Sequence, residues 1–407
     1  MTTEQALGTY PFPGRCPFQL PEEFAWLRRH APVSQVTLAH GAPAWLVTSH
    51  DAIRTVLSDE RFSRTPVRER PYRTGDNAGP APEQGGGFDF GMSVADPEAH
   101  TRWRAIVGRV LTVRHAESMR AAVGDIVDAR LDALATQPRP VDLMTTLAGT
   151  VPLDVLCELF AVPADLRSVF TDWAAGLRGA GSSMAAFGVA MRSLYEGAVR
   201  LVARERAEPT RGVLTTLMST PAADGSLLTD HELVSTVLLL TIAGYETVCT
   251  QLGNGLVALF QHPAELAELI GGEVPSDAAV EEILRYAQAG TGFSGTTYTT
   301  EDVELCGVTI PAGSAVFISV DSAGRDESHV TDPDTFDLSR GTAASHLAFG
   351  FGHHFCLGAP LARVELRETL ARLCRRFPTV QLTCRPDDVP FTSNRFSRYP
   401  RELLVTY

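Results

Sequence analysis

The stretch HLAFGFGHHFCLGAPLAR, residues 346–363, decides the fold, because it places a cysteine among glycines directly before a helical pattern. A thiolate at the start of a helix is stabilised by the helix macrodipole and by the free backbone N–H groups of the first turn. Glycines beside it let the backbone approach a flat group closely. The stretch therefore predicts that Cys356 is a cofactor ligand, with a buried free cysteine beside a glycine-rich turn as the alternative.

A zinc site is a further alternative for the same stretch, and it would use His353, His354 and Cys356. Zinc takes four protein ligands in a structural site, or three and a water in a catalytic one. Neighbouring histidines do not readily both point at one ion. Zinc is therefore the weaker interpretation.

Composition excludes several classes of function. The 407 residues are 44% hydrophobic, which is typical of globular proteins, and their net charge of −13 disfavours binding to nucleic acid or to anionic membranes. The sequence contains no lysine, which excludes a Walker A phosphate loop and a Schiff-base enzyme. Seven cysteines without a C-x-x-C pair argue against a disulfide framework and predict a cytoplasmic protein.

The sequence predicts one mainly α domain over residues 1–407, because it shows neither an internal repeat nor a linker-like shift in composition. Strand-like runs predict a small β-rich edge near residues 30–50, helical periodicity dominates residues 96–290, and strand patterns return after residue 296. Residues 71–91 hold six glycines and three prolines and are predicted to form a long loop that is either functional or disordered. No apolar run approaches the ~18–20 residues of a membrane span.

One long helix is predicted from a capping box at Thr229 and Glu232, since no proline follows until Pro263. About 32 residues of helix would extend ~48 Å. Its apolar middle holds one acid, Glu246, next to Thr247. A buried acid is unfavourable unless it is paired or carries protons, and a threonine hydroxyl can bond to the carbonyl one turn back. The alternative is a close helix crossing with an ion-paired glutamate.

The glycine-rich stretch resembles the haem-binding loop of the cytochrome P450 family, whose pattern F-G-x-G-x-H-x-C-x-G it matches at every fixed position. The resemblance implies the mainly α P450 fold with a small β-rich side and one haem b. It implies that Cys356 is the axial ligand of the iron and that Phe349 and Gly350 shield the sulfur. It also implies that His354 reaches a haem propionate and that Gly358 permits close contact.

Other motifs agree with this resemblance. AGYETV, residues 243–248, is similar to the oxygen-activating segment of the family, with Glu246 and Thr247 as the groups that guide protons. Glu282 and Arg285 fit its E-x-x-R motif, which implies a buried structural pair.

Two positions concern the haem propionates. By resemblance His100 and Arg104 would bind them, with a solvated helix face as the alternative. Many bacterial members carry an arginine for the same purpose at the place where this sequence has Thr297.

The resemblance is to soluble bacterial members, and it implies an enzyme that activates O₂ to hydroxylate, or otherwise oxygenate, a bulky apolar small molecule such as a natural-product intermediate. Oxidative C–C or C–N coupling of an aromatic substrate is the alternative, and a non-catalytic haem sensor is a remote one. No dinucleotide or flavin motif occurs, so electrons would come from a ferredoxin and its reductase. The protein is expected to be a cytoplasmic monomer without nucleic-acid or membrane partners.

Two arginine-rich segments, 98–120 and 356–376, each hold five arginines against two glutamates, a net charge of +3, and are expected to receive an acidic ferredoxin. The residues expected to line the substrate site by resemblance are Phe88, Phe90, Leu239, Ala243, Ala289, Gly290, Phe293 and Phe396.

Overall fold

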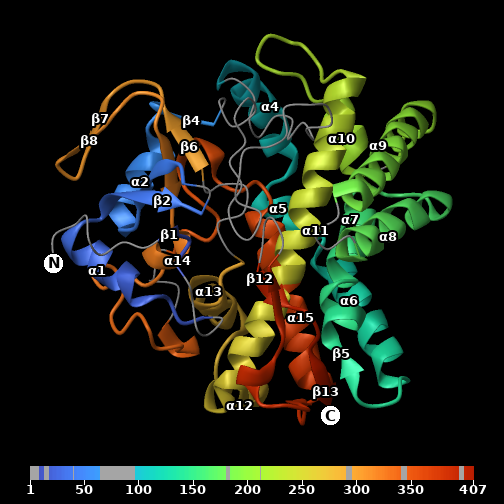
Figure 1. The fold of residues 1–407 in the computed structure, drawn as a ribbon. Helices are drawn as coiled ribbons and strands as arrows, with labels where there is room; N and C mark the ends of the chain where they lie inside the picture. Colours follow the sequence, from blue (N-terminus) through green and yellow to red (C-terminus); the bar gives the residue numbers. More distant parts are fainter. Residues whose placement is uncertain are drawn as a thin grey trace. The chain divides into compact units, whose positions relative to one another are not determined.

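The computed structural model describes residues 9–12, 18–39, 41–64, 97–179, 184–210, 212–289, 296–340, 346–393 and 398–407. Helices dominate over strands, as predicted (Figure 1). The chain divides into two compact units. Unit 1 comprises Met1–Glu83, Thr250–Cys356 and Thr379–Tyr407, and unit 2 comprises Gln84–Cys249 and Leu357–Pro378.

Unit 1 is built around a six-stranded sheet with the strand order β1-β2-β3-β9-β6-β4. The antiparallel hairpin of β2 and β3 confirms the β-rich edge predicted near residues 30–50, and β3 pairs in parallel with β9. The bounds are β1 Thr9–Tyr10, β2 Val33–Leu38, β3 Pro43–Val47, β4 Phe62–Ser63, β6 Thr296–Thr299 and β9 Ala315–Ile318.

Each face of this sheet has its own apolar cluster, because side chains alternate along a strand. Helix α1 (Glu22–His30) packs on one face, against Tyr298 and Phe317. Helix α2 (His50–Ser58) packs on the other face. Residues 346–358, which carry Cys356 and are called the cysteine loop below, contribute Leu347 to the same cluster. The loop that carries Cys356 is thus anchored on the α2 face.

The remaining elements of unit 1 are short helices and short antiparallel strands. Strands β7 and β8, β10 and β13, and β11 and β12 pair antiparallel. The bounds are α12 Pro263–Gly271, α13 Ser276–Tyr286, β7 Val303–Leu305, β8 Val308–Ile310, α14 Val320–Ala323, η4 Leu338–Arg340, η5 Gly352–His354, β10 Gln381–Leu382, η6 Pro386–Asp388, β11 Phe391–Ser393, β12 Arg398–Pro400 and β13 Leu404–Thr406.

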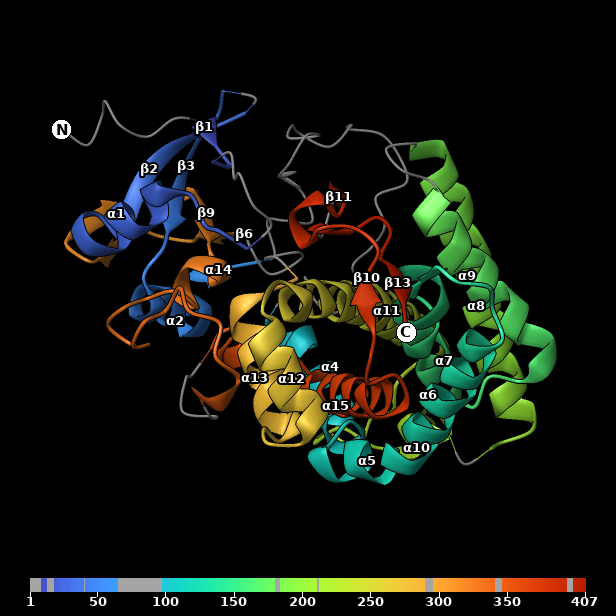
Figure 2. The same cartoon turned by 90° about the horizontal axis from the view of Figure 1, so that it is seen from below.

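Unit 2 is helical, and α8 and α9 run side by side in both views (Figures 1 and 2). Helix α15, which follows Cys356, packs on α5 and α6. The bounds are α4 Pro97–Val110, α5 Val113–Ser118, α6 Arg120–Ala135, β5 Val141–Asp142, η2 Met144–Ala148, α7 Val151–Leu159, α8 Ala164–Gly179, α9 Met184–Ala207, α10 Val213–Ser219 and α15 Ala359–Arg376.

Helix α11 (Asp230–Gln261) has 32 residues and confirms the long helix predicted from the sequence. Its capping box forms in both directions: the Thr229 N–H donates to Glu232 Oε2 at 2.7 Å, and the Glu232 N–H donates to Thr229 Oγ1 at 3.2 Å. The helix is long and apolar enough to cross a membrane, but 67% of its most apolar window is buried within the protein. Such burial is typical of a core helix.

Candidate active site

The cysteine loop of unit 1 is tightly hydrogen-bonded around an exposed thiol. The Cys356 N–H donates to the Phe349 carbonyl at 2.9 Å, and the Phe355 N–H donates to the Gly352 carbonyl at 3.0 Å. Gly350 takes a φ of +72°, which side chains rarely adopt. The loop therefore fixes the backbone of Cys356 while its side chain stays exposed.

A close contact between the cysteine loop and α2 requires a glycine at position 352. The sequence did not predict this contact. A Cβ at this position would lie 2.4 Å from the carbonyl oxygen of Leu57 in α2, and the φ of Gly352 is +68°. This glycine thus lets the cysteine loop sit on α2 rather than on a flat group.

The two histidines of the loop differ in environment. His353 is exposed, and its Nε2 lies 3.9 Å from the Glu60 carboxylate, whereas His354 is half-buried. In the described part of the chain, no cluster of three metal-ligating side chains includes Cys356. The arrangement gives the zinc interpretation no support.

Helix α11 leaves one stripe of its surface open in an otherwise buried stretch. Leu239 and Ala243 are partly exposed and Thr247 is exposed, while Glu246 is buried. Residues four apart lie on the same face of a helix, so the three form a single stripe. The Thr247 hydroxyl donates to the Ala243 carbonyl, as the sequence led us to expect.

Helix α4 is fixed against the same helix by two hydrogen bonds inside unit 2. Trp103 Nε1 donates to Thr236 Oγ1 at 2.8 Å, and Arg102 Nη1 donates to Glu232 Oε1 at 2.6 Å. His100 is buried, and Arg104, one turn later, is half-buried. A fully solvated helix face does not describe this pair.

Thr297 lies in β6 of unit 1 with its side chain 3% exposed, and its hydroxyl has no hydrogen-bond partner among the residues that the structure describes. It stands opposite Val316 in the sheet, and Val316 belongs to the α2-side cluster together with Leu347. Directly opposite residues point to one face. This buried polar group therefore lies on the face that also holds the cysteine loop.

Glu282 and Arg285 form a fully buried bidentate pair with N–O distances of 2.7 Å. Arg285 also donates to the carbonyls of Gly324, Pro333 and Thr335. The pair thus connects α13 to the segment before the cysteine loop, which suits a structural role.

Two amide side chains of α11 position backbone of unit 1, and sequence reasoning missed them. Gln251 donates to the carbonyls of Ile283 and Ala287 and accepts from the Ala289 N–H at 3.1 Å. Asn254 donates to the Gln288 carbonyl at 3.0 Å. The signal available in the sequence was two amides in an apolar helix.

The predicted site residues fall into two groups that the structure describes separately. Unit 1 holds Ala289, Glu282, Arg285, Thr297, Phe349, Gly350, His354 and Cys356, and unit 2 holds Leu239, Ala243, His100, Arg104, Glu246, Thr247 and Gly358. Gly358 precedes α15, where the Ala362 N–H donates to its carbonyl. Phe88, Phe90, Gly290, Phe293 and Phe396 lie outside the described residues.

Part of the arginine surplus counted in two segments is neutralised by acids that lie outside both segments. Arg367 pairs with Glu117 at 3.2 Å, and Arg376 pairs with Asp132 at 2.9 Å. Arg372 contacts both Glu368 and Asp128. Asp128 and Asp132 of α6 were outside the counted segments, and each pairs with one arginine of α15 within unit 2.

The chain is similar to characterised bacterial enzymes over nearly its whole length. The family model "Cytochrome P450" matches residues 276–406. Nocardicin C N-oxygenase of Nocardia uniformis subsp. tsuyamanensis is 36% identical over 402 residues, which cover 98% of each chain. Mycinamicin IV hydroxylase/epoxidase of Micromonospora griseorubida is 35% identical over 405 residues, again 98% of each chain.

Solved structures show the same similarity. The mixed-function P450 MycG matches with a TM-score of 0.89 at 34% identity, covering 98% of this chain and 100% of its own. CYP105P1 in complex with filipin I matches with a TM-score of 0.88 at 33% identity, covering 98% of this chain and 99% of its own.

Proposed function

Because this chain belongs to the cytochrome P450 family, whose members are haem-dependent monooxygenases, we propose that Cys356 is the axial thiolate of a haem b held by residues 1–407 as one haem domain. The hydrogen-bonded loop with its exposed thiol is the single observation that carries this assignment. We further propose that Phe349 and Gly350 shield the sulfur and that Gly358 starts the helix whose dipole favours the thiolate.

The residues of both units fit a haem. In unit 1, the buried Thr297 hydroxyl, which finds no partner among the described residues, suits a propionate oxygen, and His354 is half-buried near the thiol in sequence. In unit 2, the buried His100 and the half-buried Arg104 offer two further donors on one helix face. Thr297 thus takes part of the role that an arginine has in many bacterial members.

When bound, the haem supplies the chemistry that converts O₂ and two electrons into an oxidant. Our proposal for this chain concerns the proton supply. Thr247 holds its own hydroxyl proton on the Ala243 carbonyl, so its oxygen remains free to accept a bond on the open stripe of α11. Glu246 is the buried acid next to it and passes protons toward that stripe.

The proposed substrate is a bulky apolar natural-product intermediate. The open stripe of α11 offers Leu239 and the small Ala243 as apolar wall, and Gln251 fixes the backbone of Ala289. The relatives named above are an N-oxygenase and a hydroxylase/epoxidase, which supports oxygen insertion over oxidative coupling and argues against a sensor. Glu282 and Arg285 are proposed as structural residues.

For the remaining properties, we propose a soluble cytoplasmic monomer that receives electrons from a ferredoxin and its reductase and binds neither nucleic acid nor membrane. The support is the bacterial origin of its relatives and the acidic net charge of −13.

The decisive experiment is spectroscopic. The reduced protein under carbon monoxide should show the red-shifted band of thiolate ligation, and Cys356→His should abolish that band while keeping an imidazole-type spectrum. A wild-type protein that binds no haem, or that shows only the imidazole-type spectrum, contradicts the assignment. Titration with macrolide and other polyketide compounds, read as the shift of the ferric haem to high spin, then tests the substrate class.

A further inference from the structure

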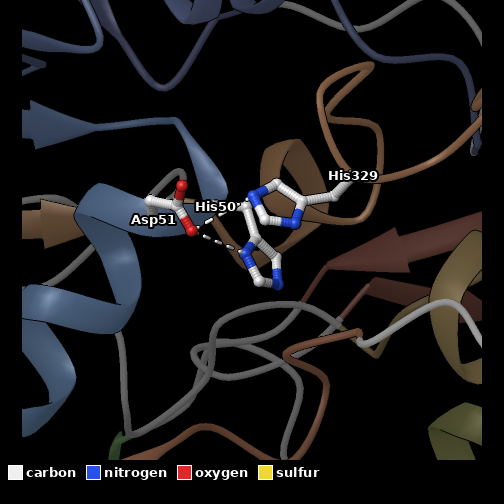
Figure 3. A group of neighbouring side chains, drawn as sticks. All are labelled: His50, Asp51 and His329. Atoms are coloured by element: carbon white, nitrogen blue, oxygen red, sulfur yellow. Dashed lines mark ion pairs between the residues drawn. The ribbon is translucent and has the colours of Figure 1, made fainter.

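A cluster of two histidines and an aspartate lies in unit 1, away from the residues assigned above. His50 and Asp51 are the first residues of α2, and His329 comes from the segment after α14 (Figure 3). The Asp51 carboxylate points toward both imidazoles (Figure 3). One ligand atom from each residue lies within 4.8 Å of the other two, so the three side chains converge on one point.

The distances match a transition-metal site. His329 Nε2 lies 3.1 Å from Asp51 Oδ1, and His50 Nδ1 lies 3.6 Å from the same oxygen. Ligand atoms of a tetrahedral zinc ion lie about 3.3 Å apart when the metal–ligand bonds are about 2.0–2.1 Å. The two observed separations bracket that value.

The backbone holds the two histidines in place through one carboxylate residue, Asp326. Its Oδ2 accepts from the His50 N–H at 2.8 Å, and its backbone carbonyl accepts from the His329 N–H at 3.0 Å. The two imidazoles are therefore close before any ion binds, with ring centroids 3.9 Å apart. The side chain of His50 is 1% exposed, whereas those of Asp51 and His329 are 78% and 26% exposed, which leaves a path for an ion from solvent.

We propose that His50, Asp51 and His329 bind one zinc ion, with water as the fourth ligand. Two neutral imidazoles and one carboxylate are donors that favour Zn²⁺ over Mg²⁺ or Ca²⁺, which prefer oxygen ligands alone. The ion connects the start of α2 to the segment around His329. None of the three residues is assigned above to haem binding or to the oxidation reaction.

The test uses haem-loaded protein without an affinity tag, dialysed against Zn²⁺ and analysed for bound metal. We expect one Zn²⁺ per chain and a rise in the thermal unfolding temperature, because the ion binds the folded state only. Asp51→Asn and His329→Gln, two substitutions at accessible side chains, should each raise the Kd for Zn²⁺ at least ~10-fold and remove the thermal shift. Mg²⁺ at equal concentration should change neither quantity.

Two control variants test whether zinc binds elsewhere. His231→Gln changes an exposed histidine that lies between Asp230 and Glu232, and Cys306→Ser removes an exposed thiol. Both controls should bind zinc like the wild type. Equal affinity in the wild type, Asp51→Asn and His329→Gln would overturn the proposal, as would loss of binding in Cys306→Ser alone. Unchanged circular dichroism and haem absorbance show that each variant is folded.

Discussion

The Thr247 hydroxyl donates to the Ala243 carbonyl across one turn of α11, and both residues lie on the only stripe of that stretch open to its surroundings in the described part of the helix. The bond keeps the threonine side chain in one rotamer, with its oxygen facing the stripe. The neighbouring Glu246 is buried, where an acid is unfavourable unless it is paired or carries protons.

The first prediction concerns this threonine. Thr247→Ala should retain haem and substrate binding but divert electrons into peroxide, with at least ~10-fold less product per NAD(P)H consumed, because positioned groups that guide proton transfer contribute that much or more. Thr247→Ser keeps the hydroxyl and should retain most of the coupling. The yields of product and of peroxide per NAD(P)H consumed measure the coupling. Wild-type coupling in both Thr247→Ala and Glu246→Gln would refute the proton-delivery role.

The second prediction uses the buried hydroxyl of Thr297. Thr297→Val has nearly the same shape and lacks the hydroxyl. If that group binds a propionate, the substitution removes a bond to a charged group, worth ~1.5–3 kcal/mol, and haem should transfer to apomyoglobin ~10-fold faster or more. If Thr297 binds nothing, removal of an unsatisfied buried hydroxyl should instead stabilise the protein against urea and leave haem transfer unchanged.

The third prediction addresses substrate positioning. Gln251→Leu leaves the Ala289 N–H and two carbonyls without their side-chain partner, at about 1–3 kcal/mol for each buried group that stays unsatisfied. We expect a lower unfolding temperature and a raised substrate Kd in the spin-shift titration. Gln251→Glu keeps the acceptor for the Ala289 N–H and should be less affected in substrate binding. Equal substrate affinity in all three proteins would contradict a positioning role.

The fourth prediction is a dependence of stability on pH. Burial raises the pKa of the Asp321 carboxyl from 3.8 to about 6, against the opposing charges of Arg325 and Arg398. Between these values the folded state binds more protons than the unfolded one, so stability should fall as pH rises from about 4 to 6. Asp321→Asn should remove this carboxyl's contribution to the slope and stabilise the protein by about 3 kcal/mol at pH 7.

Urea unfolding at several pH values measures the effect. The wild type and Asp321→Asn should have similar stability near pH 4, where the folded-state carboxyl is protonated. A constant difference between the two proteins from pH 4 to 7 would show that Asp321 does not titrate in this range.

The fifth prediction revises where a ferredoxin is recognised. Arg114 in α5 and Arg375 in α15 are exposed, and neither has an ion pair among the described residues, unlike Arg367 and Arg372. Arg114→Glu and Arg375→Glu should slow the first electron transfer several-fold at low salt, and the difference should shrink as salt screens charges over ~8–10 Å. Arg192→Glu, an equal charge change on α9, is the control. Equal slowing in all three variants would point to net charge rather than docking.

Sequence reasoning succeeded where the signal is local. The capping box at Thr229 predicted the start of α11, and strand-like runs predicted β2 and β3. It failed where partners are distant in sequence. Asp132 on another helix pairs with Arg376, and His329 contacts His50 from a distant part of the sequence. No short window of sequence could contain either pair.

Helix α2 packs against the cysteine loop and supports it. Its nine residues extend about 13 Å, with His50 at one end and the Leu57 carbonyl near the other, where Gly352 leaves no room even for a methyl group. A helix this short is stiff along its axis, and the Leu57 carbonyl packs directly against Gly352. We therefore expect a displacement of His50 to shift the backbone that carries Cys356. The position of the sulfur can therefore be tuned by engineering the distant end of α2, with every residue beside the thiol left intact.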